Sequence, residues 1–179
     1  MNDFMRYLPL SQGDRADESA VHSDRRVEYA EVLEQAAVVI DTEPSVHLAD
    51  RDLARVVPRG VQPTESEPAA RLRGLAHFAR TGPRKIPVRL LSHAVLLYLA
   101  VVRQTTLAPM LAPLTSGAVA LHLAATAPTE IRAVIKWHAL RATDAGWEFG
   151  RGPVLEATAV EMVEFLGGRS LIAPKRAAK

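Results

Sequence analysis

The sequence predicts an α+β fold, in which a largely helical N-terminal part packs on a small antiparallel sheet with a closing C-terminal helix. Apolar residues recur at helical spacing through most of the chain before residue 103. Between residues 118 and 157 they alternate as they do in half-buried strands. Helical spacing returns at 159–166, and Gly167 then supplies a C-terminal stop. With 179 residues, 48% of them hydrophobic, the chain can form one domain with a sizeable core.

Proline and glycine divide the N-terminal part into its expected helices. The spacing predicts a helix over 24–40 that ends before Pro44, and a short helix that ends at Val57. A third helix begins at Pro68, which suits a first helical turn, and ends before Gly82.

The segment 90–102 is apolar nearly all round, which is typical of a buried helix. A membrane-spanning helix needs about 20 apolar residues, and Arg103 ends this run after 13. We therefore expect a core helix and no transmembrane segment. The chain has no cysteine, and residues 1–10 lack the charged-then-apolar order of a secretory signal, so the expected location is the cytoplasm.

Three segments are expected to form strands, namely 118–126, 131–143 and 146–157. The middle segment is ambiguous, because its apolar residues fit a helical stripe as well as a strand. Its β-branched and aromatic content favours the strand. Asp144 and Gly146 form a turn signal that separates it from the third segment.

The charges are distributed unevenly along the chain. Residues 1–70 hold 14 acidic against 7 basic side chains, a net charge of −7, and residues 71–179 hold 6 against 15, a net charge of +9. The proline-rich stretch 58–68 lies close to this change of sign and is the best linker candidate. We expect an acidic N-terminal arm over 1–62 with one or two short helices, a globular α+β domain over 63–170 and a basic tail over 171–179. The two halves should attract each other, or the basic half should attract an acidic partner.

Weak signals for ligand binding come from four residues: Trp137, Trp147, Arg151 and Arg103. Trp147 and Arg151 on one face of a strand could stack against a planar or acidic ligand, although such pairs are more often packing contacts. Arg103 is the only formal charge between residues 90 and 129, and it either holds an anion or extends from the end of a helix into water. No phosphate-binding glycine loop and no nucleophile motif is present.

A second candidate surface is basic. Its members lie within 19 residues of one another and are Arg71, Arg73, Arg80, Arg84, Lys85 and Arg89. Such a cluster suits nucleic acid or an acidic protein. No aromatic side chains are interleaved with the cations in the pattern that single-strand stacking requires.

Residues 140–169 read LRATDAGWEFGRGPVLEATAVEMVEFLGGR. This segment resembles the C-terminal segment of the actinobacterial maleylpyruvate isomerase-like proteins, a mycothiol-dependent branch of the DinB-like metalloenzymes. Tails of that family have a strand ending in Ala-Thr-Asp, a tryptophan after a turn, a Gly-x-Gly-Pro strand and a helix ending in Gly-Arg. The matching residues here are Ala142–Asp144, Trp147, Gly150–Pro153 and Gly168–Arg169. The resemblance covers 30 of the 179 residues.

In that family three histidines hold a divalent metal inside a four-helix bundle. The resemblance thus implies a mycothiol- and metal-dependent isomerase or transferase, with His77, His93 and His122 as the candidate ligands. Metal sites of this type typically include two imidazoles one helical turn apart. No two of the six histidines are three or four residues apart.

The leading expectation is therefore a non-catalytic ligand- or partner-binding module without a cofactor, related to the family through its tail. We expect its partner to be another protein or a second copy of the chain. The metal- and mycothiol-dependent enzyme and a nucleic-acid-associated protein that uses the basic cluster are the two alternatives.

Overall fold

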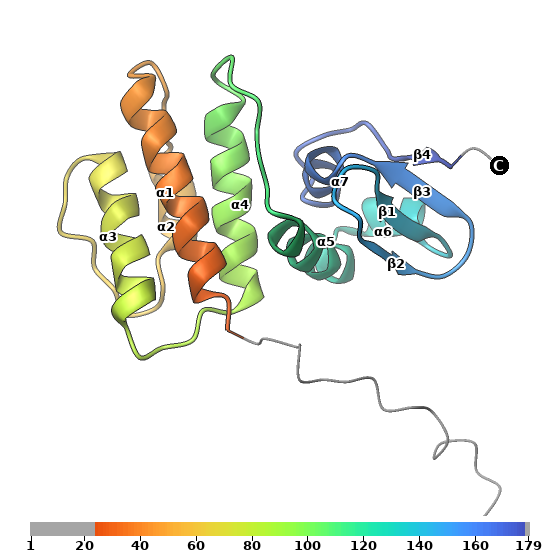
Figure 1. The fold of residues 1–179 in the computed structure, drawn as a ribbon, viewed down its shortest axis with the longest axis horizontal. Coiled ribbons are helices and arrows are strands. Elements are labelled where there is room, and N and C mark those ends of the chain that lie inside the picture. The colour runs from red at the N-terminus through yellow and green to blue at the C-terminus, as the bar shows by residue number, and fades with distance from the viewer. Residues whose placement is uncertain (1–23, 178–179) are drawn as a thin grey trace, which may run out of the picture.

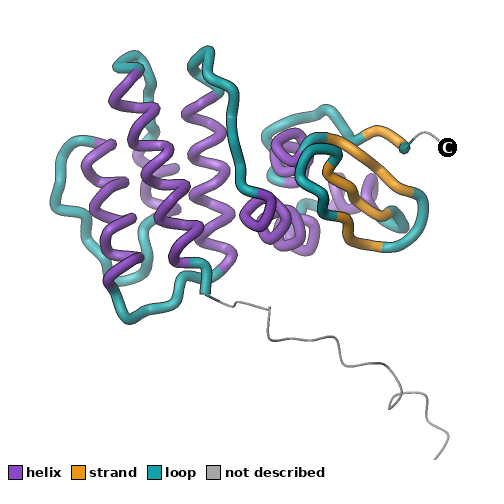
Figure 2. The backbone as a smooth tube through the Cα atoms, viewed as in Figure 1, coloured by secondary structure: helices purple, strands orange, loops and turns teal. Residues whose placement is uncertain are grey.

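The computed structural model describes residues 24–177, which form seven helices and one four-stranded sheet (Figures 1 and 2). The helical part comes first, the strands follow and a helix closes the fold, so the α+β prediction is confirmed. The first four helices are α1 (Arg26–Thr42), α2 (Asp50–Val56), α3 (Pro68–Thr81) and α4 (Val88–Val102).

Helix α1 lies between α3 and α4, and α2 packs against α4 (Figure 1). Tyr29, Leu33, Ala36 and Ala37 follow the helical period on α1 and are fully buried. Helix α4 is buried on most of its surface, as its apolar sequence predicted. The buried side chains of α1 and α2, which come from the segment expected to be an acidic arm, belong to the same apolar cluster as those of α3 and α4.

Oppositely charged side chains connect α1 to α3. Arg80 forms a two-pronged ion pair with Glu34, and Arg73 pairs with Asp41. The hydrogen bond from Arg80 lowers the pKa of Glu34 below its ordinary value, against a smaller opposing effect of burial. The acidic side of α1 and the basic side of α3 thus neutralise each other in part.

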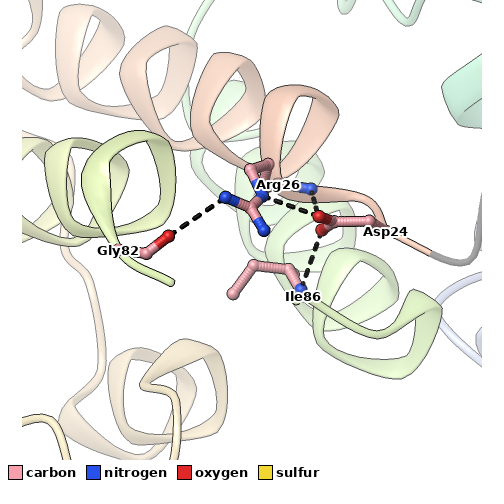
Figure 3. Close-up of polar contacts among 4 residues, drawn as sticks. All are labelled: Asp24, Arg26, Gly82 and Ile86. Atoms are coloured by element: carbon pink, nitrogen blue, oxygen red, sulfur yellow. Dashed lines mark hydrogen bonds and ion pairs between the residues drawn. The ribbon is translucent and has the colours of Figure 1, made fainter. Parts of the chain in front are cut away.

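The start of α1 is tied to the segment that precedes α4 (Figure 3). One carboxylate oxygen of Asp24 accepts hydrogen bonds from the backbone N–H groups of Arg26 and Ile86, at 3.2 and 3.1 Å. The guanidinium of Arg26 donates to the other oxygen at 2.7 Å and to the carbonyl of Gly82 at 3.0 Å. The backbone N–H of Arg25 also donates to the Ile86 carbonyl at 2.9 Å. These bonds hold the chain around Ile86 in one place.

The segment 118–126 is not a strand but the second half of a helix, α5 (Pro113–Thr126). Pro113 stands in its first turn, where the fixed φ of proline favours a helix. Thr115, Ser116, Val119 and Ala120 bury one narrow face, at helical spacing, where α5 packs on α4 and the last helix. The other apolar side chains of α5 remain partly exposed. Together with the buried ones they give the sequence the alternation that predicted a strand.

The ambiguous segment 131–143 contains both types of structure. Its first half belongs to α6 (Thr129–Ile135), and its second half forms β1 (Ala139–Ala142). Trp137, with a φ of 65°, turns the chain between them. The strand prediction was therefore wrong for 131–135 and confirmed for 139–142.

The remaining strands are β2 (Glu148–Gly150), β3 (Val154–Ala157) and β4 (Lys175–Arg176). The order in the sheet is β2-β1-β3-β4. The outer pairs are antiparallel, but β1 and β3 are parallel, so the expectation of a wholly antiparallel sheet was wrong. The reason is the loop from Gly150 to Pro153, which carries the chain past the start of β1 and lets β3 begin beside β1 in the same direction.

Helix α7 (Ala159–Leu166) closes the fold as predicted. A capping box formed by Thr158 and Glu161 satisfies its first backbone N–H groups. Met162, Val163 and Leu166 are fully buried, and α7 packs on α5 and, to a smaller extent, on α4 and β3. The apolar core therefore continues from the helical part through α5 and α7 to the sheet.

Among residues 24–177, no single helix is both long enough and apolar enough to cross a membrane. Helices α5 and α6 have the required length and composition only as a pair, and the chain bends by 113° between them.

Candidate functional site

A basic pocket of about 630 Å³ lies between the end of α2 and the segment that leads into α4. Six basic side chains line it: Arg55, Arg59, Arg84, Lys85, Arg89 and His93. The remaining lining residues are apolar: Ala54, Val57, Pro58, Ile86, Pro87 and Leu90. No carboxylate is among these lining residues. We refer to this hollow as the basic pocket.

The contacts at Ile86 position one wall of the basic pocket. Ile86 is 1% exposed, and Asp24 accepts a hydrogen bond from its backbone N–H (Figure 3). Its carbonyl accepts one from the backbone N–H of Arg25. Arg84 and Lys85 precede this buried residue and are exposed, so their side chains extend from a fixed backbone. Pro87 follows as the N-cap of α4 and determines where that helix begins.

Two hydrogen bonds join this wall to the opposite one. Nη1 of Arg84 donates to the carbonyl of Arg59 at 3.0 Å. Gly60 has a φ of 79°, and a Cβ at that position would lie 3.6 Å from Nη1 of Arg84, so the turn and the guanidinium lie in close contact. Nδ1 of His93 lies 3.0 Å from the carbonyl of Arg55. Because a carbonyl only accepts, this nitrogen carries the proton, and Nε2 is the acceptor of the neutral ring.

The positive charge of the basic pocket is little compensated within residues 24–177. Arg55 has one acidic partner there, Asp52 at 3.6 Å. The other four cations make no ion pair within that range. The field extends to α5, where burial, His93 and Arg89 together lower the pKa of His122.

The structure divides the predicted basic cluster into two groups. Arg73 and Arg80 face the acids of α1, and Nε of Arg71 donates to the carbonyl of Glu65. Arg84, Lys85 and Arg89 line the basic pocket. The sequence argument missed Arg55 and Arg59, which complete it. Arg55 lies four residues after Arg51, a spacing that places both cations on one side of a short helix, whereas Arg59 lies beyond the end of α2.

The three candidate metal ligands do not converge. His77 is exposed on α3, and α1 lies between α3 and the helix that carries His93 (Figure 1). His93 and His122 are within electrostatic range of each other. Over the described part of the chain, no group of three His, Asp or Glu side chains is placed to hold a metal ion. His77 therefore lies apart from His93 and His122.

The four weak ligand-binding candidates are not brought together either. Nε1 of Trp147 donates to the Ser116 hydroxyl at 3.0 Å, and its ring stacks on Phe149, so Trp147 connects the hairpin to α5. Arg103 donates to a carboxylate oxygen of Glu164 at 2.6 Å and to a backbone carbonyl. Trp137 and Arg151 are exposed and take part in neither of these contacts.

Comparison of the chain with protein-family models, with curated proteins and with solved structures finds no match.

Proposed function

We propose that this protein is a non-catalytic binding module whose ligand is an anion held in the basic pocket. The observation that carries the proposal is the lining itself: five arginine or lysine side chains and one histidine surround a single hollow, without a carboxylate among them. Like charges at such spacing repel one another, and a bound anion relieves that repulsion.

The lining also restricts the chemistry of the ligand. Guanidinium groups suit phosphate and carboxylate oxygens, which they can contact with two parallel N–H groups. The volume of about 630 Å³ lies in the range of small-molecule sites and exceeds that of one phosphate. Apolar side chains provide half of the twelve lining residues. A ligand with two or more anionic groups on an apolar body fits this combination.

Nucleic acid is the second candidate, because phosphates along a backbone would meet the same cations. The salt dependence separates the two ligands. The logarithm of the affinity for nucleic acid falls linearly with the logarithm of the salt concentration. The slope is proportional to the number of phosphates that are neutralised. A small anion that contacts two or three cations gives a shallower slope.

The tail supports a proposal of kinship but assigns no chemistry. Residues 139–166 contain a strand, a turn, two further strands and a helix, whereas the maleylpyruvate isomerase-like resemblance implies one strand at Gly150–Pro153, where the chain here passes from β2 into the loop before β3. A shared fold does not transfer an activity. We therefore propose binding at the basic pocket and carry over no activity from that family.

The experiment is a calorimetric titration of the protein with inorganic tripolyphosphate. Lys85→Ala and Arg89→Ala each remove one exposed cation from the basic pocket, and each should weaken binding roughly three- to tenfold, or about 0.7–1.4 kcal/mol. Arg176→Ala, on β4, removes an exposed cation outside the pocket and serves as the matched control. Equal affinity in the wild type and both pocket variants would refute the proposal.

A further inference from the structure

Trp137 is an unusual residue on the surface of the C-terminal part. Its side chain is 78% exposed. Its φ of 65° makes it the only non-glycine residue with a positive φ among residues 24–177. A bulky side chain in this conformation is strained, and such strain is concentrated at functional positions. An exposed tryptophan held in a strained conformation thus indicates a contact with something outside the chain.

The neighbouring loop depends on this conformation of Trp137. Gly150 and Gly152 both have positive φ values. A Cβ on Gly152 would lie 2.1 Å from the carbonyl oxygen of Trp137, and one on Gly150 would lie 2.7 Å from that of His138. Two glycines are therefore required for the loop to pass the Trp137 backbone. Arg151 lies between them and is exposed.

Cations accompany the indole. Nζ of Lys136 lies 5.3 Å from the centre of the Trp137 ring. Arg132 lies on α6 and Lys136 directly follows its last residue, and both line a hollow of about 520 Å³ whose other walls are mostly apolar. Within the described part of the chain, Arg132, Lys136 and Arg151 form no ion pair.

We propose that Trp137 and the hollow beside α6 form a second ligand site, which takes a planar aromatic group that carries a phosphate, as a nucleotide does. The base stacks on the exposed indole, and its phosphate lies near Lys136 and Arg132. Stacking of a base on an aromatic side chain with a neighbouring cation is a recurring mode of nucleotide recognition. The site is separate from the basic pocket and does not depend on it.

The free nucleotide and single-stranded nucleic acid share this chemistry, and the experiment distinguishes them. In a Trp147→Phe variant, Trp137 is the only tryptophan. Its fluorescence is titrated with adenosine monophosphate and, separately, with a short oligodeoxyadenylate. We expect saturable quenching by at least one of them. Lys136→Ala in that background should weaken the binding of the quenching ligand several-fold. Lys85→Ala, which alters only the basic pocket, should leave that affinity unchanged.

A second variant separates function from structure. Glycine accepts a φ of 65° without strain, so Trp137→Gly should melt at the same temperature as the wild type or higher, and it should lose the binding. If Trp147→Phe does not fold, the difference in quenching between the wild type and Trp137→Gly gives the same result.

Absence of quenching by both ligands would overturn the proposal. Quenching by vesicles of acidic phospholipid without any quenching by the nucleotides would also overturn it, and would assign the surface to a membrane. A lower melting temperature for Trp137→Gly would show that the indole supports the fold instead.

Discussion

Tyr29 connects the core to the basic pocket through one hydroxyl group. Tyr29 is fully buried in α1, and its hydroxyl donates to the carbonyl of Val56 at 2.5 Å. Burial raises the pKa of this hydroxyl, so it carries its proton at all physiological pH values. Val56 is also fully buried, and its neighbours Arg55 and Val57 line the basic pocket. The bond therefore holds the C-terminal end of α2 against α1.

The substitution Tyr29→Phe removes the hydroxyl and leaves the Val56 carbonyl buried without this donor. An unsatisfied buried acceptor costs about 1–3 kcal/mol, and the loss of the buried hydroxyl itself offsets part of that cost. We expect the free energy of unfolding to fall by about 1–2 kcal/mol, which corresponds to roughly 2–8 °C in a chain of this length. Because the end of α2 is loosened, tripolyphosphate should also bind more weakly.

Urea denaturation gives the free energy of unfolding, and calorimetry gives the affinity. Tyr98→Phe is the matched control. Tyr98 is also mostly buried, and its hydroxyl accepts a hydrogen bond from the backbone N–H of Met110 at 3.1 Å, away from the basic pocket. That variant should lose stability without losing affinity. A stability change below about 0.5 kcal/mol for Tyr29→Phe, the usual range of neutral surface substitutions, would refute the reasoning.

Three further predictions concern packing and pH. Gly117→Val should lower the free energy of unfolding by about 1–3 kcal/mol, because even a Cβ at Gly117 would lie 3.2 Å from the Trp147 ring. An unchanged midpoint of urea denaturation would contradict that packing. Asp24 has a lowered pKa, since its hydrogen bonds and the Arg26 charge outweigh the opposing effect of burial. Its contribution to stability is therefore present above the unfolded-state pKa of about 3.9 and is lost as the pH falls, and Asp24→Asn should flatten the acid limb of a pH–stability curve. The pKa of His122 is also lowered, so protonation destabilises the fold below about pH 6.5; His122→Gln should remove that part of the loss between pH 7 and pH 5, and an identical curve would contradict it.

The sequence predicted those elements whose apolar pattern has only one interpretation. Helix α4 is apolar nearly all round, and α7 combines a capping box with a regular apolar face. Helix α5 was mistaken for a strand because its small side chains bury only a narrow face, so that the exposed apolar residues gave the period of a strand. The parallel pairing of β1 and β3 depends on how the loop at Gly152 passes the backbone of Trp137. No local sequence pattern predicts that tertiary contact.

Only part of the basic pocket could be predicted from the sequence, for a similar reason. Arg84, Lys85 and Arg89 are close in sequence and were identified as basic. Their separation from Arg73 and Arg80 follows from the packing of α3 against the acidic side of α1. Arg55 and Arg59 join them only because α2 packs on α4 and the Tyr29 hydroxyl holds its end. Tertiary packing therefore brings the two groups of cations together in the basic pocket.

The most direct test of the anion-binding proposal is to locate the ligand by nuclear magnetic resonance. A ¹⁵N-labelled sample is titrated with inorganic tripolyphosphate, and the backbone amide shifts are followed residue by residue. Binding in the basic pocket predicts saturable shifts concentrated at residues 54–59 and 84–93, and these shifts should be reduced in Arg89→Ala. Shifts that do not saturate, or that are centred on other parts of the chain, would contradict the proposal.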